Sequence, residues 1–353
     1  MKSYVLRNRV IKLIVLVTLF SLFDSSAFAV ADYAKPDATC QNISTNTKSR
    51  LSTSYPAQNS NSLCRRIYFT RYDDSGGVIW SMNPNGEDQR KVMSGFSPKL
   101  SPDGKLILFL NYTPTGYHIF VANVDGTNTR QLTVDDPSAP NPPFRYHLTP
   151  VWSPDGKQIA YSSGVDIAND RDGLSIPFDI WIMKADGTSK LQLTHDINFD
   201  RDPTWSPDGT KIAYMKNTDV SYSGPSNIYV MNNDGTNQIN LSNSSFQDFH
   251  PSWSPDGNQI AFVTNSGDHF PEIYTMRPDG SDRKRVTFVS QVDSGIPLFY
   301  AYFPSWSPNS KRIIFTRVPT NNANMEIFSL DIKTNRLENL TNNSKQDLEG
   351  SWA

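Results

Sequence analysis

The chain has 353 residues, with 33 Lys and Arg against 35 Asp and Glu. A formal net charge of −2 excludes a strongly basic nucleic-acid-binding protein, because such proteins gather Lys and Arg on their binding surface. The aromatic content of 12% excludes a disordered chain, and the low charged fraction of 19% is typical of turns and short strands.

The first 29 residues have the pattern of a secretory signal peptide. Basic residues precede and enter an apolar run over 11–23, and Ala27 and Ala29 match an A-x-A cleavage site. The run is shorter than the roughly 20 residues of a membrane-spanning helix, although an uncleaved N-terminal anchor is the alternative. We therefore predict a periplasmic or secreted protein with no transmembrane segment after cleavage.

Residues 30–65 form an N-terminal arm that contains both cysteines of the chain. Cys40 and Cys64 flank a polar stretch over 41–62. Because an oxidising compartment favours disulfides, we expect these two residues to be bridged. Closing a loop of this size stabilises a fold by about 3 kcal/mol on the chain-entropy model.

From residue 100 onward, one pattern recurs about every 50 residues, which indicates a repeat architecture. Trp-Ser-Pro-Asp-Gly occurs three times, close variants come before and after, and the chain ends just after a further Trp. The repeats begin at Leu100, Trp152, Trp205, Trp253 and Trp306, and the last Trp is Trp352.

Each repeat contains four short strands separated by turn sequences. In one repeat an apolar strand over 158–161 follows the Gly, a second over 180–183 ends in Asp-Gly, and a third ends on Leu193-Thr194. Ser-Pro-Asp-Gly and Asp-Gly are favoured turn sequences. The Trp-bearing segment is itself a strand, and its indole is expected to fill the space between neighbouring sheets.

Repeated four-stranded sheets predict an all-β fold of the β-propeller type. Strands of the type that follows the Ser-Pro-Asp-Gly turn begin near 66, 105, 158, 211, 259 and 312. We therefore expect a six-bladed propeller of four-stranded antiparallel blades over 66–353. The C-terminal strand is expected to complete the blade that begins at residue 66, which leaves no free sheet edge.

The repeats over 66–353 resemble those of the TolB family, periplasmic proteins of the Tol–Pal cell-envelope system. The resemblance rests on Trp-Ser-Pro-Asp-Gly, on Ile228-Tyr-Val-Met231 followed by Asp234-Gly-Thr, and on Leu-Thr at matching offsets. It implies a monomeric propeller that binds a protein or peptide, such as an envelope lipoprotein. TolB proteins also carry an α/β domain before the propeller, for which residues 30–65 are too few. Similar repeats occur in prolyl-oligopeptidase-type propellers and in oligogalacturonate lyases.

Catalytic motifs are absent from the sequence. It contains no G-x-S-x-G nucleophile elbow, P-loop, G-x-G-x-x-G or H-E-x-x-H. Two cysteines 24 positions apart do not supply a paired-cysteine zinc motif. We expect a non-enzymatic protein without a cofactor.

The candidate site consists of side chains just before each Trp-bearing strand end, expected at the mouth of a central channel. One set lies three positions before the Trp, and a second lies five before, with an aromatic neighbour between. These residues are Thr149, Asp202, His250, Phe303 and Glu349, then His147, Asp200, Asp248 and Asp347, and finally Tyr302. Acidic groups beside aromatic anchors predict a mouth that receives a basic or flexible segment of a partner.

Three alternatives remain open for these residues. His147 and His250, with Asp202 or Glu349, have the N and O donors that bind a divalent cation. Such a cation would support a metal-dependent polysaccharide lyase that acts on an acidic sugar. In the second alternative, the side chains serve only to cap strand backbone groups and bind water. In the third, the propeller is one module of an assembly whose active parts lie on other chains.

Overall fold

The computed structural model describes residues 66–73, 76–134, 144–166, 177–217, 224–266, 270–288, 299–319 and 324–352. Within these ranges the chain forms 24 strands, β1–β24, and no helix of a length and apolarity that would cross a membrane. The predicted signal peptide and the predicted Cys40–Cys64 bridge lie outside the described residues.

The strands are hydrogen-bonded into two four-stranded and two eight-stranded sheets. One four-stranded sheet has the order β24 (Gln346–Trp352), β1 (Ile67–Asp73), β2 (Gly76–Met82), β3 (Arg90–Ser94). The other has the order β20 (Phe299–Trp306), β21 (Arg312–Pro319), β22 (Glu326–Asp331), β23 (Leu337–Asn339).

Each eight-stranded sheet contains two runs of four consecutive strands. The first contains β4 (Phe96–Leu100), β5 (Leu106–Thr113), β6 (Gly116–Asn123), β7 (Arg130–Gln131), β8 (Phe144–Trp152), β9 (Gln158–Asp166), β10 (Phe178–Lys184) and β11 (Leu191–Gln192). The second contains β12 (Asp200–Trp205), β13 (Lys211–Asn217), β14 (Ser226–Asn232), β15 (Ile239–Asn240), β16 (Gln247–Trp253), β17 (Ile260–Asn265), β18 (Glu272–Met276) and β19 (Lys284–Arg285). The two runs meet through a short parallel pairing, β6 with β8 and β14 with β16. The sheets therefore differ in strand count from the equal sheets that the sequence predicts.

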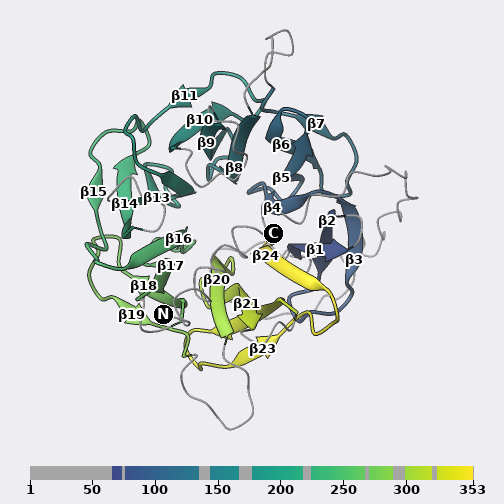
Figure 1. The fold of residues 1–353 in the computed structure, drawn as a ribbon. Coiled ribbons are helices and arrows are strands. Elements are labelled where there is room, and N and C mark those ends of the chain that lie inside the picture. The colour runs from purple at the N-terminus through teal and green to yellow at the C-terminus, as the bar shows by residue number, and fades with distance from the viewer. Residues whose placement is uncertain are drawn as a thin grey trace, which may run out of the picture.

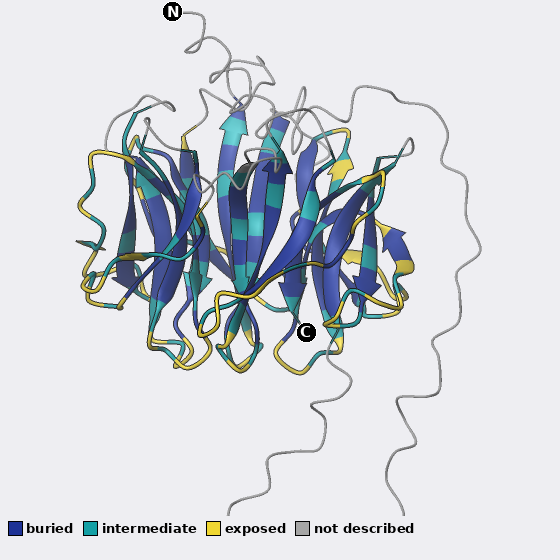
Figure 2. Cartoon of the chain, turned by 90° about the horizontal axis from the view of Figure 1, so that it is seen from below, coloured by how far each residue is buried: buried dark blue, intermediate teal, exposed yellow. Residues whose placement is uncertain are grey.

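The sheets are arranged around a central axis as in a β-propeller (Figure 1). Strands β4, β8, β16 and β20 lie toward the middle, and β3, β7, β11, β15, β19 and β23 lie at the periphery. The last strand, β24, pairs antiparallel with β1, from Trp352 opposite Ile67 to Gln346 opposite Tyr72. Figure 2 shows that buried residues run through the sheets, whereas exposed residues gather in the turns.

The Ser-Pro-Asp-Gly sequence, which follows four of the six Trp-type strands, closes its turn through its own side chains. The Ser101 hydroxyl donates to Asp103 Oδ1 at 2.6 Å and accepts the Leu106 amide at 3.0 Å. Gly104 has φ of 70°, in the left-handed region that glycine enters without steric cost. The same Ser–Asp bond occurs at 2.7 Å between Ser153 and Asp155. The motif therefore marks a self-contained turn.

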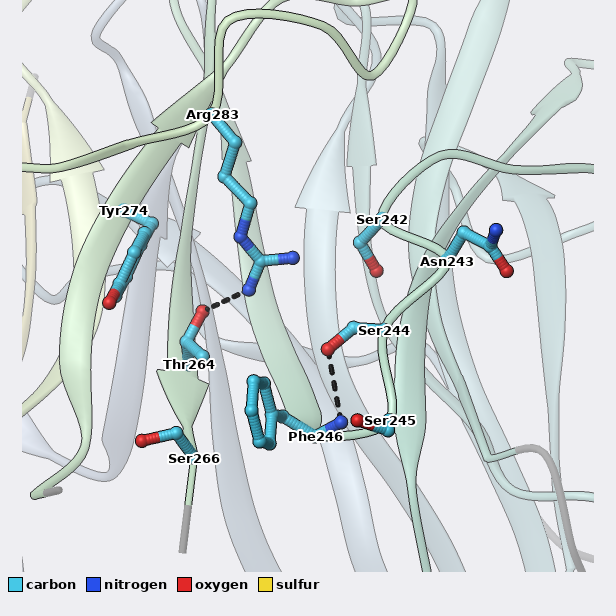
Figure 3. Close-up of a pocket in the computed structure, with 9 residues that line it drawn as sticks. All are labelled: Ser242, Asn243, Ser244, Ser245, Phe246, Thr264, Ser266, Tyr274 and Arg283. Carbon is cyan, nitrogen blue, oxygen red and sulfur yellow. Dashed lines mark hydrogen bonds between the residues drawn. The ribbon is translucent and has the colours of Figure 1, made fainter. Parts of the chain in front are cut away.

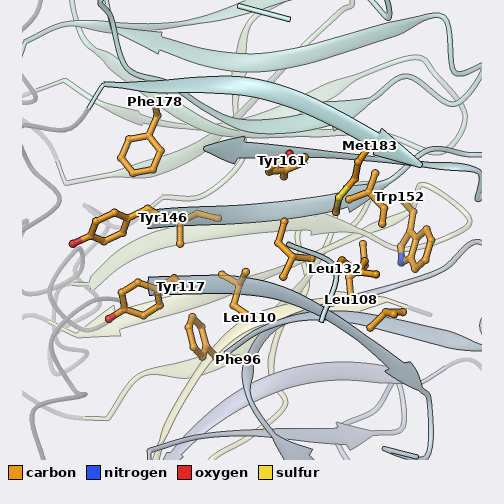
Figure 4. Close-up of a cluster of buried hydrophobic side chains, with 14 of the residues drawn as sticks. Phe96, Leu108, Leu110, Tyr117, Leu132, Tyr146, Trp152, Tyr161, Phe178 and Met183 are labelled. Atoms are coloured by element: carbon orange, nitrogen blue, oxygen red, sulfur yellow. The ribbon is translucent and has the colours of Figure 1, made fainter. Parts of the chain in front are cut away.

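The Trp residues pack between neighbouring sheets, as the sequence predicts. Trp152 on β8 belongs to a buried cluster that also contains Leu108 of β5 and Met183 of β10 (Figure 4). Its Nε1 donates to the Lys99 carbonyl of β4 at 3.2 Å. Trp306 makes the same bond to the Ser252 carbonyl at 3.1 Å. These two indoles thus tie their four-strand runs to the preceding ones, whereas within the described ranges Nε1 of Trp205, Trp253 and Trp352 makes no such bond.

Candidate functional site

The predicted site residues three positions before each Trp share one backbone feature. In all six copies the register of the Trp-type strand shifts at this point, which is the mark of a β-bulge. In every copy the residue at the bulge has a positive φ, in the left-handed region, and it is never glycine. The φ values are 55° at Ser97, 51° at Thr149, 57° at Asp202, 50° at His250, 55° at Phe303 and 56° at Glu349. We call these six residues the bulge ring.

Left-handed residues other than glycine are uncommon, and each costs roughly 1 kcal/mol. Bulges of this kind re-aim a side chain and occur often beside functional sites. The bulge ring therefore contains six strained positions at equivalent places in the repeats, occupied by hydroxyl, carboxylate, imidazole and phenyl groups.

Side chains of the bulge ring contact one another across neighbouring sheets and strand runs. His250 Nε2 lies 3.7 Å from Asp202 Oδ2, and the His250 ring stacks on Phe303 with a centroid distance of 4.2 Å. On another part of the ring, the Ser97 hydroxyl donates to Glu349 Oε2. Five of the six residues of the bulge ring are thus linked in two groups. Asp202, His250 and Phe303 form the group with the aromatic stack, and Ser97 and Glu349 form the group with the buried carboxylate.

The backbone of three bulges is held by hydroxyl groups of the preceding run of strands. The Ser97 amide donates to Thr70 Oγ1 at 2.9 Å, and the Glu349 amide donates to Thr316 Oγ1 at 3.1 Å. The Asp202 amide donates to Ser162 Oγ at 3.1 Å. These three hydroxyl residues have no solvent exposure, so the anchors are internal. Sequence reasoning did not identify them, although a Ser or Thr directly after three apolar residues of the strand that follows the turn, as in Ile67-Tyr-Phe-Thr70 and Ile313-Ile-Phe-Thr316, is a readable signal.

Thr149 is connected to the same network. Its hydroxyl lies 2.8 Å from Ser162 Oγ, the group that also accepts the Asp202 amide. Ser162 therefore couples two adjacent positions of the bulge ring.

Burial determines the charge state of the ring. Burial lowers the pKa of His250 to about 4, against the opposing effect of the Asp202 carboxylate. Burial raises the pKa of Glu349, which the Ser97 hydroxyl and the Lys99 ammonium partly offset. Burial lowers the pKa of Lys99 in turn, although Glu349 and Asp202 both favour its charged form. His250 is therefore neutral at pH 7.

Lys99 is a member of the site that sequence reasoning missed. It is half-buried, and both ring carboxylates act on its charge. It stands one residue before Leu100, where the other repeats have valine, serine or threonine. A lysine at this place was the available signal.

The acidic residues five positions before the Trp lie in the interior and not on the channel mouth. Asp200, Asp248 and Asp347 have no solvent exposure. Asp347 accepts two bonds from Arg71, and Asp248 accepts two from Arg283 at 2.9 and 3.0 Å. The expectation that these carboxylates face a partner is therefore corrected: their role is to pair buried or half-buried cations.

Asp200 differs from the other two because its pairing is weaker. Its Oδ2 lies 3.6 Å from Lys216 Nζ, which also binds Asp196. Burial raises the pKa of Asp200 to about 7 despite the lysine, and burial likewise raises the pKa of nearby Asp179 to about 6.

The two histidines proposed as metal ligands have separate surroundings. His147 is buried, lies 3.0 Å from Ser163 Oγ and has its ring 5.4 Å from that of His118. His250 contacts Asp202 and Phe303 instead. Across the described ranges, no three His, Cys, Asp or Glu residues are grouped so as to hold a metal ion. Tyr302 is also buried, in a cluster with Val263 and Leu348.

Comparison with known proteins identifies the family. The sequence matches the family described as PD40, TolB beta propeller domain, over residues 96–220 and 217–353. The chain belongs to the TolB β-propeller family. A protein TolB homolog of Chlorobium luteolum is 25% identical over 151 residues, which is 43% of this chain and 28% of that protein. The match thus spans less than a third of that TolB homolog.

Solved structures agree on the TolB-like fold. TolB from Acinetobacter baumannii aligns with a TM-score of 0.62 and 18% identity, over 82% of this chain and 67% of the other. Oligogalacturonate lyase from Vibrio parahaemolyticus aligns with a TM-score of 0.51 and 12% identity, over 78% of this chain and 74% of the other. At these identities the likeness concerns the fold alone.

Proposed function

We propose that this protein is an exported, non-enzymatic TolB-like propeller that binds a protein partner at the bulge ring, in cell-envelope organisation or protein transport. The observation that carries the proposal is the ring itself, in which six equivalent strained positions hold six different side chains. A purely structural ring would be served by glycine, which has no left-handed strain. Family membership and the TolB homolog support the same class of function.

The ring is chemically divided, which favours a peptide with two features. Glu349 and Asp202 with Lys99 form a polar part, whereas His250 and Phe303 form a stacked aromatic part. A partner segment with a basic or backbone donor group for the carboxylates and an apolar side chain for the aromatic pair would match both parts.

The proposal includes a six-bladed architecture. Each eight-stranded sheet counts as two blades joined by the β6–β8 or β14–β16 pairing, and β24 completes the blade of β1–β3. The protein is further proposed to be a monomer in the periplasm or outside the cell. Mass spectrometry of the mature protein tests the N-terminus at residue 30 and the Cys40–Cys64 peptide.

Affinity isolation from envelope extract tests the binding site. The bait is the protein as produced, and the test variant is Asp202→Ala, His250→Ala and Glu349→Ala combined. The matched control combines three exposed positions, Glu87→Ala, Lys190→Ala and Lys333→Ala. A retained protein must then be purified and titrated against all three baits. Binding that survives the ring variant, or falls equally in the control, contradicts the proposal.

A metal-dependent polysaccharide lyase is the competing function, supported by the structural likeness to oligogalacturonate lyase. The separate surroundings of His147 and His250 count against it. Formation of unsaturated products from oligogalacturonate with a divalent cation, lost in His147→Ala/His250→Ala, would replace the binding proposal.

A further inference from the structure

A second site lies away from the bulge ring, in a polar pocket of about 530 Å³ (Figure 3). One wall is the segment 242–246, which connects β15 to β16. The opposite wall consists of Thr264 on β17, Tyr274 on β18 and Arg283 just before β19. The volume falls in the range of about 300–1,000 Å³ that is usual for small-molecule sites.

Arg283 forms a rigid part of this pocket. Its guanidinium donates to both oxygens of Asp248 at 2.9 and 3.0 Å and to Thr264 Oγ1 at 2.8 Å. It also lies over the rings of Phe262 and Tyr274, at 5.0 and 5.3 Å from their centroids. Because the fully buried Asp248 neutralises it, the pocket presents hydrogen-bond donors without an uncompensated charge.

The segment 242–246 is fixed by internal hydrogen bonds. The Ser242 hydroxyl accepts the Ile228 amide at 3.0 Å and donates to Asn227 Oδ1 at 3.1 Å. The Ser244 hydroxyl accepts the Phe246 amide at 3.0 Å, as Figure 3 shows. The wall is therefore held in one shape before any ligand arrives, which reduces the entropy lost on binding.

Several polar groups of the lining remain available for a ligand. The Asn243 amide and the hydroxyls of Ser245, Ser266 and Tyr274 make no side-chain hydrogen bond within the described parts of the chain. They supply both donors and acceptors. Phe246 lines the same pocket with 44% of its surface exposed, so an apolar ring stands among these polar groups.

We propose that this pocket binds one or two sugar rings of a neutral oligosaccharide. A sugar has an apolar C–H face and a rim of hydroxyls, which match an exposed phenyl ring surrounded by hydroxyl and amide groups. The serine-rich lining favours many weak hydrogen bonds over one strong ion pair. A uronate is a poorer match, because its carboxylate would compete with Asp248 for Arg283.

Titration with defined tetrasaccharides tests the proposal. The neutral probes are chitotetraose, cellotetraose and maltotetraose, and the acidic probe of equal length is tetragalacturonate. Saturation-transfer NMR reports contact, and calorimetry gives the Kd. We expect saturable binding of at least one neutral probe and a clearly weaker affinity for tetragalacturonate.

Three variants of exposed residues locate the binding. Phe246→Ala removes the phenyl platform, and Tyr112→Ala removes a side chain of nearly equal exposure, 45%, from β5. Phe246→Ala should weaken binding at least fivefold, and Asn243→Ala by a smaller factor, whereas Tyr112→Ala should leave Kd unchanged. The proposal is overturned if no neutral probe binds, if only tetragalacturonate binds, or if Phe246→Ala and Tyr112→Ala behave alike in folded protein. The triple variant of the bulge ring should keep saccharide binding, which separates this test from that of the partner site.

Discussion

Asp347 on the last strand accepts hydrogen bonds from Nε and Nη2 of Arg71 on the first strand, at 2.7 and 2.8 Å. The carboxylate has no solvent exposure, and Arg71 also lies 4.5 Å from the Trp80 ring centroid and donates to Gln89. This pair therefore links the two ends of the described chain within one sheet, where β24 and β1 also share their backbone bonds.

Loss of this pair should destabilise the protein strongly. Asp347→Ala leaves the largely buried Arg71 guanidinium without its carboxylate, and removing one partner of a buried pair costs about 3–5 kcal/mol. Chemical denaturation of variant and wild type gives the difference. The control Asp88→Asn alters a more exposed carboxylate that pairs with Arg66 and should change the midpoint little. Equal effects of the two substitutions would contradict the role given to Asp347.

Replacing the carboxylate of Asp200, at the equivalent place in another repeat, should stabilise the protein instead of destabilising it. Burial raises the pKa of Asp200 to about 7 in the folded protein, above the ordinary value of 3.8. The folded state therefore binds the proton more tightly, so this residue lowers stability as pH rises from about 4 to about 7. Asp200→Asn should raise the free energy of unfolding at pH 8 by about 1–2 kcal/mol and change it little near pH 4.

Denaturation of wild type and Asp200→Asn at matched pH values measures that difference, and contributions of other groups cancel in the comparison. Asp248→Asn is the matched variant in the next repeat, and it should destabilise at pH 8 because Arg283 loses a charged partner. Destabilisation by both substitutions at pH 8 would show that the Lys216 pairing outweighs the burial of Asp200.

His250 should remain neutral well below the ordinary histidine range. Burial lowers its pKa to about 4, so stability that depends on the neutral ring is present above pH 6.5 and is lost as pH falls toward 4. Phe303→Ala opens the stacked face to water and should move the pKa upward, toward 6.5. NMR titration of the imidazole measures both values. An ordinary pKa in the wild type would contradict the half-buried placement of the ring between Asp202 and Phe303.

The hydroxyl anchor beneath Glu349 should matter for both stability and binding. Thr316→Val keeps the side-chain shape but removes the acceptor of the Glu349 amide, which costs about 1–3 kcal/mol for a buried group. Thr316→Ser retains the hydroxyl and is the control. Partner affinity should fall in the valine variant and be retained in the serine variant. The reverse order would remove Thr316 from the positioning of the ring.

Local signals in the sequence predicted much of the fold. Ser-Pro-Asp-Gly marks turns because Ser101 and Asp103 close them from within, and Trp152 marks the packing between strand runs because its large ring joins the buried cluster there. The joining of two four-strand runs into one eight-stranded sheet was not predictable, because the β6–β8 pairing depends on where Gly116 meets Arg145.

The candidate site was predicted only in part. Positions three before the Trp do form a ring, but the bulge that aims them shifts the register, so residues two positions earlier turn into the interior. Asp248 thus meets Arg283, from a different strand connection, which no spacing rule reveals. Lys99 was missed because it departs from the residues that the other repeats have at its position and belongs to no recurring motif.

Site-specific photo-crosslinking at Phe303 tests the central claim most directly. A benzoylphenylalanine placed there lies in the bulge ring, and the same group at the exposed Lys190 is the control. We predict one crosslinked protein in envelope preparations from the Phe303 position, absent from the Lys190 position and lost when Asp202 and Glu349 are replaced by Ala. The same crosslinks from both positions, or none from Phe303 in folded protein, would contradict partner binding at the ring.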